Sequence, residues 1–230
     1  MRITRYLISA LLILVILAGC GGRRSSPAGE IDTGLFTPNY IQALDTGLFH
    51  WNHVPVRIKF DLPTNWSDLY PSDTTLHVEG ANEWNQPGLQ ALTMVVKSGQ
   101  DVTVSFVPQS HFGGKAQGVT TYTYNSGSRE IIAAGIEVAL DNPYVGTLSA
   151  ADAQVIIAHE IGHAIGIGGH SPYSEDLLYY LHTFGSPRFP TPRDLNTIMT
   201  AYHAEFGRGI PSGQAFQPLT PGEIRTAVIE

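Results

Sequence analysis

The sequence predicts an α+β fold. Two stretches, 56–61 and 102–107, alternate apolar and polar residues with the period of a half-buried strand. A third, 149–166, is apolar on most sides and long enough for a buried helix. The chain length and the 43% apolar composition fit one domain with a sizeable core, which we expect to be a monomer.

Residues 1–19 predict a secretory signal peptide. Arg2 and Arg5 precede an apolar run, 7–17, which is shorter than the roughly 20 residues that span a membrane. The run leads into Leu17-Ala18-Gly19-Cys20, which resembles a lipobox. This resemblance implies a lipid anchor on Cys20 and an extracytoplasmic protein tethered to a bacterial membrane. The alternative is an ordinary secretory signal followed by an incidental cysteine.

Composition argues against disulfides and against nucleic acid as a partner. Cys20 is the only cysteine, so we expect neither a disulfide nor a second thiolate that caps a metal. The 13 Lys and Arg are outnumbered by 20 Asp and Glu, the formal net charge is −7, and no basic cluster is present. Nucleic acid is therefore not an expected partner.

Residues 20–50 are expected to form a tether followed by a docking or pro-like segment. The part 21–29 is small and polar, as suits a flexible tether. Beyond it, Asp32-Thr33-Gly34-Leu35-Phe36 recurs as Asp45-Thr46-Gly47-Leu48-Phe49. The Leu and Phe side chains favour turns pinned to the main domain. A pro-segment, 31–49, that covers a functional cleft is the alternative hypothesis.

The main domain, 51–205, is expected to contain five strands. They are predicted at 56–61, 92–96, 102–107, 119–124 and 130–140, with a helix over 73–86 and a glycine-rich loop over 110–118. The Thr and Tyr content of 119–124 suits the edge of a sheet. Asp141 is interpreted as a solvated loop residue rather than a calcium ligand, although structural calcium is left open.

Two helices complete the domain. Ser149, with Asp152 three residues later, is an N-cap signal for a helix that ends at Gly166. Thr191-Pro192 opens a second helix that continues to about residue 203. In the C-terminal tail, 206–230, a short terminal helix is expected to start at 220–223.

The helix 149–166 carries the residues with the clearest chemistry. His159 and His163 lie four apart, so on a helix they share a face and can hold one metal ion. Glu160 lies beside them as a general base for water at that metal. A chance pattern on a surface helix is the alternative. The apolar residues around the motif argue against it, because buried polar groups need partners.

A third histidine follows this helix. Gly166 can adopt the left-handed conformation that stops a helix, and the glycines at 168 and 169 let the chain turn back so that His170 approaches the other two. Three nitrogen ligands leave the fourth tetrahedral position open, as in catalytic zinc sites that lower the pKa of water to about 7. The sequence therefore predicts one catalytic zinc.

The motif resembles the zinc signature HExxHxxGxxH of the metzincin proteases. Ser171 after the third histidine is similar to the matrixin form, with one extra residue before His170. Residues 174–180 resemble the Met-turn segment, and 192–197 resemble the start of the last helix. The resemblance covers about 51–203 and implies a catalytic domain with a twisted five-stranded mixed sheet, an active-site helix and a smaller C-terminal subdomain.

The resemblance also implies roles for further residues. Leu178 stands where a metzincin has its Met-turn methionine, and this exchange is expected to reduce the rigidity of the site rather than remove the metal. The loop before the strand 119–124 holds only His111, so no structural zinc is expected. The strand itself would pair with substrate through Thr121, Tyr122 and Thr123.

These inferences predict a zinc endopeptidase for peptide or protein substrates. Glu160 would activate water at a zinc ion held by His159, His163 and His170. A lipoprotein that keeps the fold but binds without cleaving is one alternative, which the absent methionine and the extra glycine favour and Glu160 disfavours. A zinc hydrolase acting on something other than peptide bonds is the other.

Overall fold

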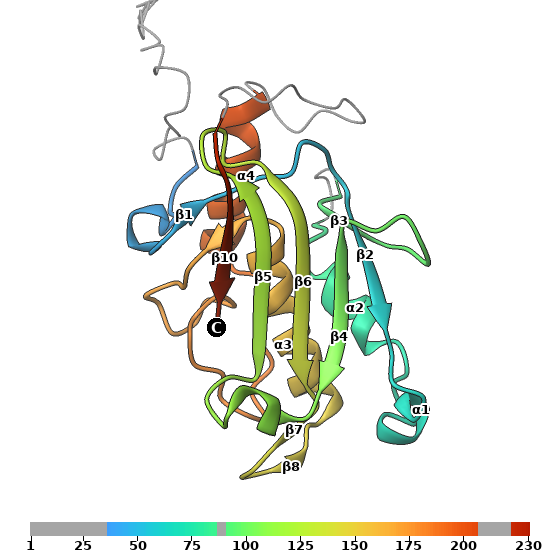
Figure 1. The fold of residues 1–230 in the computed structure, drawn as a ribbon. Coiled ribbons are helices and arrows are strands. Elements are labelled where there is room, and N and C mark those ends of the chain that lie inside the picture. The colour runs from blue at the N-terminus through green and yellow to red at the C-terminus, as the bar shows by residue number, and fades with distance from the viewer. Residues whose placement is uncertain (1–35, 87–90, 207–221) are drawn as a thin grey trace, which may run out of the picture.

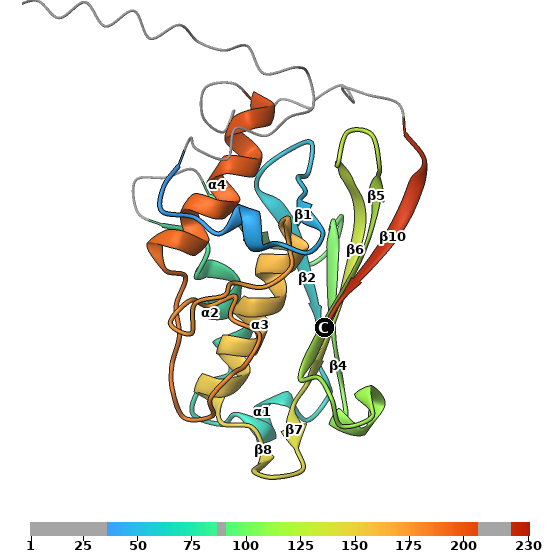
Figure 2. The same cartoon turned by 90° about the vertical axis from the view of Figure 1, so that its left-hand side faces the viewer.

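The computed structural model describes residues 36–86, 91–206 and 222–230. They form an α+β fold, as predicted, in which one mixed sheet carries the longer helices on a single face (Figures 1 and 2). No helix within these ranges is long and apolar enough to cross a membrane. The predicted signal peptide and Cys20 lie outside the described residues.

The sheet contains six strands rather than the predicted five. Their order is β10-β5-β6-β4-β2-β3. β6, β4, β2 and β3 run parallel to one another, whereas β5 is antiparallel to both β6 and β10. The bounds are β2 Val56–Asp61, β3 Thr93–Val95, β4 Val102–Val107, β5 Gly118–Asn125, β6 Ile131–Ala139 and β10 Ile224–Ile229.

The predicted alternation places one side of each strand in the core. Val56 and Ile58 of β2 are buried, and so are Val102 and Val104 of β4, while the residues between them are partly exposed. Burying each such side chain contributes about 1.5–3 kcal/mol. The main core therefore lies between this face of the sheet and the helices.

Three helices cover that face. α3, Ala150–Ala164, lies beside α2, Leu76–Asn82, and α4, Pro192–Phe206, lies next to the end of α3 (Figure 2). The Trp84 indole N–H donates to the Ala158 carbonyl at 2.8 Å, and the Tyr202 hydroxyl donates to the Ile165 carbonyl at 2.7 Å. These bonds tie α3 to its neighbours.

The helix predicted over 73–86 is shorter, because the chain already turns toward β3 at Asn85. The Asn85 side-chain oxygen accepts hydrogen bonds from the N–H groups of Leu92 and Thr93, at 2.8 and 3.0 Å. Asparagine commonly bonds nearby backbone in this way, and such bonds compete with helix. α2 accordingly ends at Asn82.

Residues 224–229 of the C-terminal tail form a strand, so the helix predicted to start at 220–223 does not continue into them; residues 220 and 221 lie outside the described residues. β10 pairs with β5 from Ile224 opposite Asn125 to Ile229 opposite Thr120. The prediction that 119–124 is an edge strand is wrong, because β10 covers it. Thr121, Tyr122 and Thr123 each lie opposite a residue of β10.

Short elements connect the larger ones. They are η1 Ile41–Ala43, β1 Gly47–Leu48, α1 Trp66–Leu69, η2 Gln109–Phe112, β7 Asp141–Asn142, β8 Gly146–Thr147 and β9 Ile167–Gly168. β1 belongs to the second repeat, 45–49, and pairs with β9 directly after α3. Leu48 and Phe49 are buried. The described part of the predicted docking or pro-like segment therefore packs into the core.

Candidate metal centre

α3 begins where the N-cap signal predicts. The Ser149 hydroxyl accepts a hydrogen bond from the Asp152 N–H at 3.1 Å and donates to the Asp152 carboxylate at 2.6 Å. This satisfies one of the free N–H groups at the helix start and places a negative charge in the first turn. The helix then carries the predicted metal-binding motif near its C-terminal end.

His159, His163 and His170 come together, with ligand nitrogens within 4.8 Å of one another. The Nε2 atoms of His159 and His163 are 3.1 Å apart. The His170 ring centroid lies 5.3 Å from that of His159 and 4.9 Å from that of His163. Among the described residues this is the one group of three potential ligands so arranged. The structure therefore contains a three-histidine site able to bind a metal ion.

Backbone carbonyls fix two of the three rings. Nδ1 of His159 lies 2.8 Å from the Leu177 carbonyl oxygen, and Nδ1 of His163 lies 2.8 Å from that of Ile167. With Nδ1 as the donor, each Nε2 presents its lone pair to the shared site. Both contacts are of the kind that orients metal-binding histidines.

All three imidazoles are held in the neutral form. Burial lowers the pKa of His159 to about 3 and that of His163 well below its ordinary value. Burial also lowers the pKa of His170, against the opposing effect of the Asp45 carboxylate. Neutral imidazole is the form that binds metals. The three histidines can therefore bind a cation without first releasing protons.

Two glycines allow the chain reversal that brings in His170. Gly166 has φ +135°, and a Cβ there would collide with the Phe49 carbonyl oxygen. The Phe49 N–H in turn donates to the Gly166 carbonyl at 2.8 Å. Gly169 has φ +142°, and a Cβ there would lie 2.9 Å from the Asp45 nitrogen. The predicted reversal is confirmed, and the second repeat is what leaves no room for side chains.

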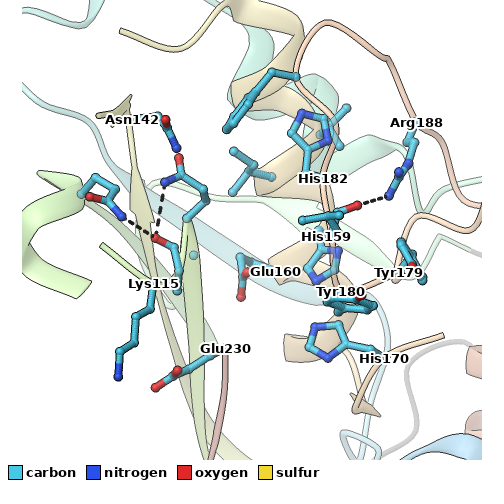
Figure 3. A pocket seen from close by; sticks show the side chains of 18 of the residues that line it. Lys115, Asn142, His159, Glu160, His170, Tyr179, Tyr180, His182, Arg188 and Glu230 are labelled. Carbon is cyan, nitrogen blue, oxygen red and sulfur yellow. Dashed lines mark hydrogen bonds between the residues drawn. The ribbon is translucent and has the colours of Figure 1, made fainter. Parts of the chain in front are cut away.

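Glu160 projects from α3 into a pocket beside the histidines (Figure 3). Its Oε2 accepts a hydrogen bond from the Thr120 hydroxyl on β5 at 2.7 Å. A Cβ on Gly118 would lie 2.5 Å from its Oε1, so glycine is needed there. Burial raises the pKa of Glu160 to about 8, although the Thr120 bond acts in the opposite direction. The carboxylate is therefore more basic than usual.

The turn at 177–178 packs against α3. The Leu178 side chain is fully buried, and a Cβ on Gly162 would lie 2.8 Å from its Cδ2. Asp194, at the start of α4, accepts hydrogen bonds from the Leu177 N–H at 2.9 Å and the Tyr40 hydroxyl at 2.6 Å. Leu178 thus lies against the helix turn that separates two of the histidines.

The pocket has a volume of about 540 Å³. His182 lies in its wall, and its Nε2 is 2.8 Å from the Asp152 carboxylate. Figure 3 shows Glu160 with His159 and His170 on one side and Lys115 and Glu230 on the other in that view. Apolar walls come from Val155, Ile156, Leu177 and Phe184, and further polar groups from Gln109, Asn142, Tyr179, Tyr180 and Arg188.

β5 contributes to the site a side chain that the sequence does not single out. Thr121 is exposed, whereas Thr120 and Tyr122 are buried. Thr120 is the residue that bonds Glu160. Two-residue alternation indicates that 118, 120 and 122 share a face, but no local pattern shows that this face meets Glu160.

Other residues considered as ligands have protein partners. The Asp141 carboxylate accepts a hydrogen bond from the Gln109 N–H at 2.8 Å. His111 Nε2 lies 3.4 Å from the Glu137 carboxylate. His182 was not singled out by the sequence, because its partner Asp152 is distant along the chain.

The site therefore combines a three-histidine group, a basic carboxylate and an adjoining pocket. Metal ions bound by three protein nitrogens with a position left open are the kind that assists hydrolysis. No protein-family model and no curated protein matches the chain.

Proposed function

We propose that this protein is a zinc-dependent endopeptidase with a metzincin-like fold. The observation that supports this most strongly is the convergence of His159, His163 and His170 beside the buried carboxylate of Glu160. The α+β architecture, with the motif on a helix under the sheet, agrees with the resemblance found in the sequence.

Zinc is the metal that this donor set fits best. Three neutral imidazoles are typical zinc ligands, and the carbonyl contacts of His159 and His163 supply the orienting shell that such ligands need. Zinc bound there would polarise a substrate carbonyl and increase the acidity of water.

The chain's own residues supply the proton transfers. Glu160 would accept a proton from the attacking water and later deliver it to the leaving amine. The Thr120 hydroxyl, 2.7 Å from one carboxylate oxygen, holds Glu160 in place for both steps. Gly118 leaves the space in which that carboxylate lies.

A peptide substrate agrees with the shape of the site. The pocket of about 540 Å³ adjoins His159 and Glu160 and has both apolar and polar walls, so it can enclose one substrate side chain. The amino-terminal motif adds a second proposal, that Cys20 carries a lipid which tethers the domain, outside the cytoplasm, to a bacterial membrane.

The test is zinc content and casein cleavage by the purified protein. We expect about one zinc per chain, and we expect Glu160→Gln to lower hydrolysis by about 10²-fold or more while keeping the zinc. Glu79→Gln is the matched control, because Glu79 is an exposed carboxylate on α2. It should leave cleavage unchanged.

Other outcomes would favour the alternatives. Zinc binding without cleavage of any protein would support the binding lipoprotein, and cleavage of esters or other non-peptide substrates alone would support a different hydrolase. Failure of the wild-type protein to bind zinc would remove the whole proposal.

A further inference from the structure

β10 lies along the edge of the sheet that leads to the metal centre. It runs antiparallel to β5, with Ile224 opposite Asn125 and Ile229 opposite Thr120 (Figures 1 and 2). Thr120 is the residue whose hydroxyl binds Glu160 at 2.7 Å. The strand therefore reaches the site at its Ile229 end.

The residue after β10 is among those that line the pocket. Glu230 lines the pocket together with Glu160, His159 and His170, and Figure 3 shows its side chain near Lys115 in that view. The direction of the strand also matters. A peptide substrate that pairs with β5 in the same direction as β10 has its carboxyl end nearest the histidines. The residues that precede the bond to be cleaved would therefore be the ones paired with β5.

Side chains anchor β10 weakly. Ile224 and Val228 are 58% and 59% exposed, whereas Ile229 is 6% exposed. Residues 223–226 are exposed as well. The strand is thus held mainly by backbone hydrogen bonds and one buried apolar side chain. Such a strand can be exchanged for another extended segment at modest cost in free energy.

We infer that β10 occupies, within the same chain, the track on which an extended peptide substrate pairs with β5. The inference rests on the proposed function for the identity of the competing ligand. An extended peptide binds a sheet through main-chain bonds at an exposed edge, and here β10 already uses that edge. β10 therefore competes with substrate, and the site opens when β10 leaves β5.

The register shows which atoms hold β10. The Ser126 N–H donates to the Glu223 carbonyl at 2.9 Å, which marks a hydrogen-bonded pair. Such pairs alternate along an antiparallel ladder. The N–H groups that point toward β5 therefore belong to Arg225, Ala227 and Ile229. We call these inward-facing, and the N–H groups of Ile224, Thr226 and Val228, which point away from the sheet, outward-facing.

This alternation provides a matched pair of variants in the full chain. Ala227→Pro removes an inward N–H opposite Tyr122 and weakens the ladder, whereas Thr226→Pro removes only an outward N–H, which edge strands tolerate. If β10 competes with substrate, Ala227→Pro should raise casein hydrolysis about fivefold or more, because one hydrogen bond between β10 and β5 is lost. Thr226→Pro should leave casein hydrolysis at the wild-type level.

A peptide copying residues 223–230 provides the second arm. We expect the added peptide to inhibit Ala227→Pro competitively and to inhibit the wild-type protein much less. Its fluorescently labelled form should bind Ala227→Pro, by anisotropy, more tightly than it binds Thr226→Pro. Hydrogen exchange should be faster at the Tyr122 amide in Ala227→Pro, as it faces β10 in the ladder.

These measurements separate the two proposals. If no variant hydrolyses any protein but the labelled peptide still binds preferentially to Ala227→Pro, the endopeptidase proposal fails while the peptide track on β5 stands. If exchange at Tyr122 rises while hydrolysis falls and the peptide does not bind, β10 is a structural part of the site and the inference is overturned.

Discussion

Gly118 and Thr120 on β5 shape the surroundings of Glu160 on α3. The glycine provides space for the carboxylate and the threonine provides a hydrogen bond. Both lie on the face of β5 that points toward α3. Both act on Glu160, which is 40 residues after Thr120 in the sequence. Their importance follows from the fold and not from their local sequence.

Gly118→Ala should displace the Glu160 carboxylate, because its Cβ would lie 2.5 to 2.6 Å from three atoms of that side chain. We expect hydrolysis to fall by roughly 10²-fold, as a misplaced catalytic group predicts, with zinc content unchanged. Gly135→Ala on β6 is the control, since a Cβ there meets no atom within 4 Å. Loss of zinc in Gly118→Ala would contradict a role confined to Glu160.

The sequence identifies the three-histidine group well because the relation between its residues is local. His159, Glu160 and His163 fall on one helix, and the φ values of Gly166 and Gly169 bear out the chain reversal that brings His170 to them. Thr120 and His182 depend on pairing between distant segments. No pattern within either segment encodes that pairing.

At the scale of elements, Asp152 connects the start of α3 to the loop that carries His182. Its carboxylate accepts hydrogen bonds from the Ser149 hydroxyl at 2.6 Å, from the Gly185 N–H at 2.7 Å and from His182 at 2.8 Å. Burial by itself raises the pKa of Asp152, but these hydrogen bonds outweigh it and bring the pKa below its ordinary value.

This linkage predicts how stability depends on pH. A carboxyl whose pKa is lower in the folded than in the unfolded state stabilises the fold above the unfolded value, about 3.9, and loses that contribution as pH falls through the folded value. The difference in unfolding free energy between wild type and Asp152→Asn should therefore be constant from pH 7 to about 5 and shrink below about 4.

Urea unfolding at several pH values measures this difference. Asp68→Asn is the control, because Asp68 is an exposed carboxylate of α1. An Asp152→Asn difference that stays the same at pH 3 and pH 7 would contradict the linkage.

Element prediction succeeds where the pattern is regular. β2 and β4 alternate in sequence as they do in burial, and Ser149 caps α3 as its sequence indicates. β10 is not predicted although its residues favour strand, because the sequence Thr220-Pro221-Gly222-Glu223 before it also suits a helix start. Only the pairing with β5 decides between the two.

For the whole molecule, a bound metal would join α3 to the loop after it. Zinc at about 100 times its dissociation constant should raise the free energy of unfolding by about 2.7 kcal/mol. This corresponds to a rise in Tm of about 5–10 °C. Chelation should reverse the shift, as differential scanning fluorimetry can measure. His163→Ala should abolish the shift, and His111→Ala, at an exposed histidine outside the group, should retain it.

The proposed membrane anchor has its own test. Cells expressing the protein should incorporate radiolabelled palmitate into the wild-type chain and not into Cys20→Ala, because Cys20 is the only thiol. Incorporation of palmitate into Cys20→Ala to the wild-type extent would contradict anchoring at this residue.

Hydrogen bonds from residues 40–51 to α3, to the turn after it and to α4 limit how far the chain can be trimmed from its amino end. Phe49 donates to Gly166, Tyr40 donates to Asp194, and the Trp51 indole N–H donates to Ala164 at 2.8 Å. Limited proteolysis that trims the chain ahead of Tyr40 should spare zinc binding, whereas a cut within 40–50 should abolish it. Any trimming that leaves the three-histidine site intact should therefore stop short of Tyr40, so that the second repeat, 45–49, stays part of the trimmed protein.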